Sequence, residues 1–240
     1  PLFVQAFGPD DEQVAMAHTN LGNVLADEGR ADEATQHYQV GLQIKERLFG
    51  AQHPRLASTR YNLGTVLLDQ GKYEEAQANI EGALAVFEAS LGPDHATVAS
   101  VLTDLARLHG MRGDHERALS HSQRALAIAT AKHPPDHPLQ GHTRLNLGLA
   151  LLGLGRPAEA LEPLERARAV LEQAAGDPVP IANVRLALAR ALWDAAGDRA
   201  RAHGLAQSAR VTYAAAGDRR RKELADADAW LAAHGQPGAR

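Results

Sequence analysis

Histidine is the one residue type in this sequence whose number and spacing could bind a transition metal. The chain of 240 residues contains 12 histidines and no cysteine, and His53, His95 and His137 recur every 42 residues. If they mark successive structural units about 8–10 Å apart, they cannot share a zinc ion, whose ligands lie about 2 Å from the metal. The segment 133–137 (His-Pro-Pro-Asp-His) offers two ligands but no third. We therefore predict no metal site and no cofactor, and expect each of these histidines to bond a helix end or to pack on the next unit.

The sequence contains no motif of a known catalytic class. It has no nucleophile elbow, no phosphate-binding loop and no metalloprotease helix motif. Its carboxylates are spread along segments with helical periodicity, where solvation is their simplest role. We predict that this chain is not an enzyme, and that any catalytic or kinase domain would belong to another part of a full-length parent protein.

Charge and hydropathy restrict the partners. The formal net charge of −4 argues against a general nucleic-acid binder, which would need a basic surface. No apolar stretch approaches the ~18 residues that read as a membrane span, so we predict no membrane insertion. The absence of cysteine is compatible with a reducing compartment. We predict a cytoplasmic protein with a protein or peptide ligand and no nucleic acid.

A 42-residue period organises the chain. Asn20, Asn62, Asp104 and Asn146 fall on this spacing, and each is followed by leucine. Two sets of glycines share the spacing, with Pro134 replacing the missing member of the first set: Gly8, Gly50, Gly92 and Gly176, then Gly29, Gly71, Gly113 and Gly155. A repeat of this length indicates a stacked array in which each unit buries its apolar face on its neighbours.

The segment 54–91 shows what one unit contains. Pro54 suits the first turn of a helix. Gly71 suits the left-handed conformation that ends a helix, and a second helix near Tyr73 stops at Gly92 and Pro93. Gly64 and Ala76 are small where the two helices must approach closely. Each unit is therefore predicted to be a helical hairpin.

The fold class predicted from this pattern is all-α: a solenoid of helix–turn–helix hairpins. Five hairpins are expected at about 12–50, 54–91, 95–133, 138–176 and 179–215 within 8–217, the fifth with a turn one residue longer. A capping helix is expected at 218–234, capped by Asp218. Residues 1–7 are interpreted as the end of a truncated preceding helix, and 235–240 as a disordered tail.

The repeat resembles a known family. Leu63-Gly64, Gly71, Tyr73, Ala76 and Ala83 resemble the tetratricopeptide repeat. The connections 48–54 (Leu-Phe-Gly-Ala-Gln-His-Pro) and 91–95 (Leu-Gly-Pro-Asp-His) resemble its kinesin-light-chain type. The segment 219–231 is similar to the C-terminal tails of bacterial multidomain serine/threonine kinases. The tetratricopeptide resemblance implies that the solenoid is a right-handed superhelix. Together these resemblances imply a regulatory or scaffolding part of a larger bacterial protein.

The resemblance also implies a binding groove, because the first helix of each hairpin lines a concave face in this family. Kinesin-light-chain repeats hold peptide backbones with helix asparagines, which implies the same role for the asparagines here. The groove would be polar in its first three units and leucine-rich in its last two. The peptide-binding residues implied are Asn20, Asn23, Tyr61, Asn62, Thr65, Thr103, Arg107, Leu145, Asn146, Leu149, Leu152, Leu186, Arg190 and Trp193.

Several alternatives remain open from the sequence. The asparagines could instead fix the stacking of neighbouring units. The leucine-rich end could be a ligand site, a dimer contact, or core covered by the C-terminal helix. The predicted function is a non-catalytic module that binds a protein or peptide in its groove; the alternative is a structural module for homodimerisation.

Overall fold

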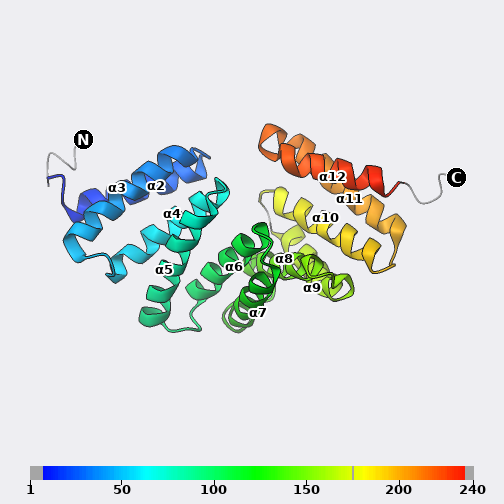
Figure 1. Cartoon of the computed structure of the whole chain (residues 1–240), viewed down its shortest axis with the longest axis horizontal. Coiled ribbons are helices and arrows are strands. Elements are labelled where there is room, and N and C mark those ends of the chain that lie inside the picture. Colours follow the sequence, from blue (N-terminus) through cyan, green and yellow to red (C-terminus); the bar gives the residue numbers. More distant parts are fainter. Residues whose placement is uncertain (1–7, 175, 236–240) are drawn as a thin grey trace. The chain divides into compact units, whose positions relative to one another are not determined.

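The computed structural model describes residues 8–174 and 176–235, and within them the chain is all-α, as predicted (Figure 1). The expected helix end at 1–7 and the tail beyond Gly235 lie outside the described residues. The chain forms two compact units, Pro1–Leu108 and His109–Arg240, which divide within one helix. Each unit is described by itself.

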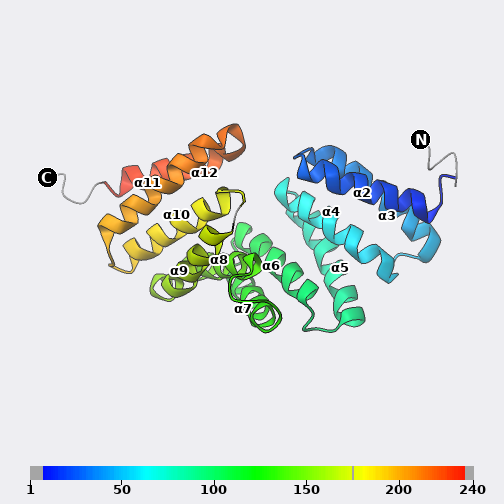
Figure 2. The same cartoon turned by 180° about the vertical axis from the view of Figure 1, so that it is seen from behind.

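The helices follow one another as pairs, and we call the first helix of each pair an A helix and the second a B helix. In the first unit α2 pairs with α3 and α4 with α5, as the views from opposite sides in Figures 1 and 2 show. The bounds there are α2 Glu12–Asp27, α3 Ala31–Phe49, the 3-10 turn η1 Pro54–Leu56, α4 Ala57–Asp69, α5 Tyr73–Leu91 and α6 Ala96–Met111.

In the second unit α8 pairs with α9 and α10 with α11, and α12 packs on α11. The A helices of the whole chain are α2, α4, α6, α8 and α10. The bounds are α7 His115–Lys132, α8 Pro138–Gly153, α9 Pro157–Gln173, α10 Val179–Asp194, α11 Arg199–Ala215, the 3-10 turn η2 Gly217–Arg220 and α12 Arg221–Ala233.

The three periodic histidines cap helices. His53, His95 and His137 each accept, through Nδ1, a hydrogen bond of 3.2 Å from the backbone N–H two residues further on. The first turn of a helix leaves N–H groups without backbone partners, and a side-chain acceptor there satisfies one of them. This confirms that the histidines bond helix ends. Among the described residues no group of three or more potential ligands is placed to hold a metal ion.

Glycine ends four A helices in the left-handed conformation. Gly29, Gly71, Gly113 and Gly155 have φ between +69° and +79°, a region that glycine enters without steric cost. In the fifth pair the turn has four residues between the helices instead of three, as predicted. Ala196 takes the left-handed position there, with φ of +55°.

Replacing Ala196 with glycine is expected to stabilise the second unit. The left-handed conformation costs a non-glycine residue about 1–2 kcal/mol. Glycine avoids this cost but loses more conformational entropy on folding than alanine does. The free energy of unfolding should therefore rise by about 0.5–1 kcal/mol. Urea unfolding measures the difference. The control is Ala195→Gly, because Ala195 has φ of −81° and should gain nothing from glycine. Equal effects at both positions would contradict the strain at Ala196.

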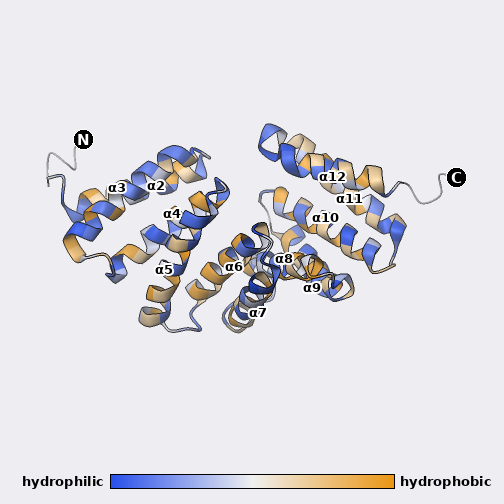
Figure 3. Cartoon of the chain, viewed as in Figure 1, coloured by the Kyte–Doolittle hydropathy of each residue, from blue (hydrophilic) through white to orange (hydrophobic). Residues whose placement is uncertain are grey.

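Each hairpin closes around small residues. A methyl group on Gly64 of α4 would lie 2.5 Å from Cγ1 of Ile80 in α5, and one on Gly148 of α8 would lie 2.5 Å from Leu164 in α9. Ile80 and Leu164 are fully buried. Figure 3 shows that the helices carry both hydrophobic and hydrophilic residues, as expected for helices with one face in the core.

Polar contacts join the first two hairpins. Lys45 of α3 is 8% exposed and donates from Nζ to Oγ1 of Thr59 in α4, at 2.7 Å. Burial lowers the pKa of Lys45, although the nearby Glu12 carboxylate acts in the opposite direction. Arg60 of α4 also pairs with Glu46 of α3, at 3.0 Å.

The C-terminal helix starts later than expected. The segment Gly217–Arg220 forms a 3-10 turn, and α12 begins at Arg221. Asp218 does not cap α12; its carboxylate accepts from the Arg221 side chain at 2.7 Å, so that prediction is wrong. The reason is that Gly217, with φ of +69°, redirects the chain into a short turn before the helix. Ala227 and Trp230 are the buried residues of α12.

Candidate protein-binding face of the A helices

In the first unit the implied asparagines bond to one another. Asn62 of α4 donates from Nδ2 to Oδ1 of Asn23 in α2, at 2.9 Å, and the same oxygen accepts from the Tyr38 hydroxyl of α3, at 2.8 Å. Asn62 therefore links two successive A helices, the stacking role left open by the sequence. Asn20 is exposed on α2.

A second cluster joins α4 to α6. The Tyr61 hydroxyl donates to Asp104 Oδ2 at 2.6 Å, and Arg107 donates from Nη1 to Asp69 at 2.7 Å. Arg107 Nε also lies 3.6 Å from Asp104 Oδ1. Four polar side chains from two A helices are thus held in fixed positions.

Burial and the neighbouring carboxylates together shift the pKa values of Tyr61 and Arg107 so that both keep their protons. Burial, followed by the neighbouring Asp104, raises the pKa of Tyr61 far above its usual range, so Tyr61 remains a hydrogen-bond donor at neutral pH. Burial alone would lower the pKa of Arg107, but the Asp104 and Asp69 carboxylates raise it overall. The Tyr61 ring also meets Phe87 edge-on, with centroids 6.5 Å apart.

The two threonines of the implied groove differ in exposure. Thr65 is half-buried, and its hydroxyl donates to the carbonyl of Asn62 at 2.9 Å. Thr103 is 6% exposed and its hydroxyl donates to the carbonyl of Ala99 at 2.8 Å. Thr103 is therefore a core residue, and a ligand in the groove could not reach its side chain.

The leucines of the second unit are placed mainly in its core. Leu145 of α8 and Leu186 of α10 are 6% and 5% exposed, so they do not form an open apolar patch. Leu152 is half-buried against the same core. Leu149 is 40% exposed and is the member of the leucine group that a partner could reach. Asn146 is half-buried beside them.

The C-terminal helix covers the end of α10. Trp193 meets Trp230 of α12 edge-on, with centroids 5.7 Å apart, and lies 4.8 Å from the His234 ring. Arg190 donates to Asp226 of α12 at 2.7 Å. The alternative that the leucine-rich end is covered by the C-terminal helix therefore describes Trp193, which packs on Trp230.

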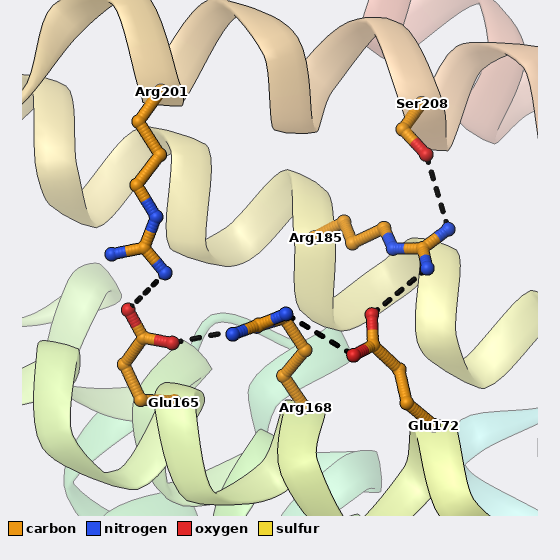
Figure 4. Close-up of polar contacts among 6 residues, drawn as sticks. All are labelled: Glu165, Arg168, Glu172, Arg185, Arg201 and Ser208. Carbon is orange, nitrogen blue, oxygen red and sulfur yellow. Dashed lines mark hydrogen bonds and ion pairs between the residues drawn. The ribbon is translucent and has the colours of Figure 1, made fainter.

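The sequence interpretation missed a charged network that connects α9, α10 and α11 (Figure 4). Arg168 of α9 pairs with Glu165 and with Glu172, at 3.4 and 3.1 Å. Glu172 also accepts from Arg185 of α10, at 2.8 Å, and Glu165 pairs with Arg201 of α11. The three- and four-residue spacings around Arg168 could have indicated its two pairs, since such residues are neighbours on a helix. The links to other helices have no signal in the sequence.

Two further findings concern the chain as a whole. Among the described residues, no helix combines the length and the apolarity needed to cross a bilayer. No curated protein matches the sequence.

Solved structures share the fold. The crystal structure of BtubC (BKLC) from P. vanneervenii is 27% identical with a TM-score of 0.61, over 68% of this chain and 65% of that one. A putative kinesin light chain with nearly identical TPR-like repeats, from Podosopora anserina, is 20% identical with a TM-score of 0.65, over 87% of this chain and 99% of that one. Aspartyl phosphate phosphatase F from Bacillus subtilis is 16% identical with a TM-score of 0.65, over 90% of this chain and 54% of that one. This chain thus spans about two thirds of BtubC, and the likenesses under 25% identity concern the fold alone.

A family model described as Tetratricopeptide repeat matches residues 12–81, 56–131 and 113–173. These overlapping matches cover more than half of the chain, from the start of α2 to the end of α9. Repeats of this family generally mediate contacts between proteins. The chain belongs to the tetratricopeptide repeat family.

Proposed function

We propose that this chain is a non-catalytic interaction module that binds a protein or peptide segment on its A helices. The observation that supports this most is the set of fixed polar side chains on the first unit, in which Tyr61, Asn62 and Arg107 are held by partners on neighbouring A helices. Side chains that are already ordered lose little entropy when a ligand binds, so they contribute more to affinity than mobile ones. An extended peptide offers the backbone carbonyls and amides that such groups can bond.

We propose ligand contacts for only some of the peptide-binding residues that the family resemblance implies. Asn20, Asn23, Tyr61, Asn62, Thr65 and Arg107 remain as candidates on the first unit, and Leu149 with Asn146 on the second. Leu145, Leu186 and Thr103 are buried, and we do not assign them a ligand contact. A regulatory or scaffolding role within a larger bacterial cytoplasmic protein stays a prediction.

Leu149→Asp is expected to weaken partner binding without unfolding the chain. Leu149 is 40% exposed, and substitutions of exposed residues usually change stability by less than about 0.5 kcal/mol. A charge there would remove the apolar contact of a bound segment, which contributes on the order of 1.5–3 kcal/mol and so about a tenfold or greater loss of affinity. Peptides selected from a displayed library on the unmodified chain provide the ligand, and calorimetry provides the affinity.

The matched control is Val211→Asp, because Val211 is 58% exposed but lies on the B helix α11. It should leave affinity unchanged. If both substitutions reduce affinity equally, the A helices are not the binding face. The alternative function, homodimerisation, predicts instead a dimer that resists dilution and that Leu149→Asp converts to monomer, as light scattering would show.

A further inference from the structure

Two aspartates end the first two A helices on the face that the proposed function assigns to a ligand. Asp27 is the last residue of α2 and Asp69 the last residue of α4, one 42-residue period apart. Each lies one turn beyond a candidate ligand residue of its own helix, Asn23 in α2 and Thr65 in α4, and so shares its face. Both aspartates are exposed. The Asp69 side chain remains 63% exposed although α3 packs along α4.

Carboxylates outnumber basic groups around these two positions. Asp104 of α6 adds a third carboxylate, and Arg107 is shared between Asp69 and Asp104, at 2.7 and 3.6 Å. Asp27 has no hydrogen-bond or ion-pair partner among the described residues. Its charge acts on Tyr38, whose pKa is raised by burial and then by Asp27. A cation from a ligand would therefore meet one unpaired carboxylate and two that share a guanidinium.

The donors of the same face are directed to partners within the protein, as the bonds of Tyr61, Asn62 and Arg107 show. A carboxylate, by contrast, has two oxygens with about four lone-pair sites and no hydrogen to donate. Asp69 accepts from Arg107 through Oδ1, which leaves its second oxygen for a ligand. The face therefore offers negatively charged acceptors, which match the ammonium group of lysine and the guanidinium group of arginine.

The charge of the whole first unit has the same sign. Residues 8–108 contain 15 aspartates and glutamates but 7 lysines and arginines, whereas residues 109–235 contain 14 and 17. A surface of one sign draws oppositely charged ligands and repels those of its own sign. The negative charge is therefore concentrated in the unit that carries Asp27 and Asp69.

We propose that the ligand of the A helices in the first unit is a basic peptide segment, with lysine or arginine side chains that pair with Asp27 and Asp69. This inference rests on the proposed function, because it names the chemistry of the ligand at the same face. An acidic segment is disfavoured, since its carboxylates would face those of the protein while Arg107 is already engaged. Exposed ion pairs are individually weak, so the segment carries several basic residues.

The test reverses one charge on the full chain. Peptides are selected on the unmodified chain from a displayed library with equal proportions of acidic and basic residues, and we expect the captured peptides to be positively charged. Asp27→Lys should weaken the affinity of such a peptide about tenfold in calorimetry, because attraction becomes repulsion. The variant should fold, since lysine is favourable at the C-terminal end of a helix and Asp27 bonds to no other described residue.

The matched control is Glu75→Lys. It changes the net charge of the unit by the same amount, but from the exposed start of the B helix α5, and should change affinity less than about twofold. Equal effects of the two reversals would overturn the inference, because overall charge and not the A-helix face would then attract the peptide.

The library also separates this inference from the proposed function. Captured peptides that are neutral or acidic, and that Leu149→Asp weakens, would overturn the basic ligand and leave a peptide-binding module standing. Failure to capture any peptide would overturn both. Added salt should weaken the captured basic peptides further, because salt screens exposed charges, and affinity that is independent of salt would also count against the ion pairs.

Discussion

Gly64→Ala should lower the free energy of unfolding of the first unit by about 1–3 kcal/mol, the usual range for overpacking a tight core. The added methyl group would lie 2.5 Å from Cγ1 of Ile80, and also 3.2 Å from the carbonyl oxygen of Ala76 and from the backbone nitrogen of Ile80. A side-chain rotation can relieve the first contact but not the two backbone contacts. The helices α4 and α5 would have to separate, and urea unfolding with circular dichroism measures the loss.

Gly82→Ala is the matched control in the same hairpin. A methyl group on Gly82 of α5 meets nothing within 4 Å, and alanine favours a helix over glycine by about 0.5–1 kcal/mol. This change should therefore stabilise the unit. If Gly64→Ala is also stabilising, helix propensity outweighs packing at this contact and the close approach is not required.

Leu164→Ala is expected to have the larger cost, about 2–5 kcal/mol, because it removes a fully buried side chain and leaves a cavity. Leu164 is also the side chain that excludes a methyl group from Gly148, since its Cδ2 and Cγ would both lie 2.5 Å from that methyl. Unlike at Gly64, no backbone atom is among the nearest contacts. A methyl group at Gly148 is therefore excluded by a side chain alone, whereas one at Gly64 is also excluded by backbone atoms.

The double variant measures this coupling. Gly148→Ala alone should destabilise the second unit, but in the Leu164→Ala background its methyl group enters the vacated space. Contacting residues couple by about 0.5–3 kcal/mol, and we expect the upper half of that range, with the second substitution neutral or stabilising. If urea unfolding shows that the stability losses of the two single variants simply add in the double variant, Leu164 is not what excludes a methyl group at Gly148.

The fold could be predicted because its signals are local. Glycine at the left-handed turn and histidine before the first helical turn act within a few residues and recur every 42 residues, and proline follows this histidine at positions 54 and 138. Even the longer fifth turn followed from the sequence. The start of α12 did not, since Asp218 is as suitable a cap as many others and only the turn at Gly217 decides against it.

The candidate site was harder to predict because exposure depends on neighbouring helices. Leu145 and Leu149 are one turn apart on α8, yet they are 6% and 40% exposed. The pattern of apolar residues alone cannot distinguish them, since a helix that is apolar all round gives no preferred face. The contact between Tyr61 and Asp104 likewise joins residues 43 positions apart. The sequence around either residue does not predict this contact.

The buried lysine has a consequence for covalent labelling. Lysine occurs only at positions 45, 72, 132 and 222, and all but Lys45 are exposed. Reagents that acylate amines will modify the exposed three readily. The Lys45 amine, held on Thr59 between α3 and α4, becomes available only when those helices part. Its lowered pKa reflects burial, so the same burial that favours the reactive neutral amine also keeps reagent away. The rate of acylation at Lys45, followed by mass spectrometry, would therefore measure how often the first two hairpins separate. The acylation rates of the other three lysines serve as the reference for exposed amines.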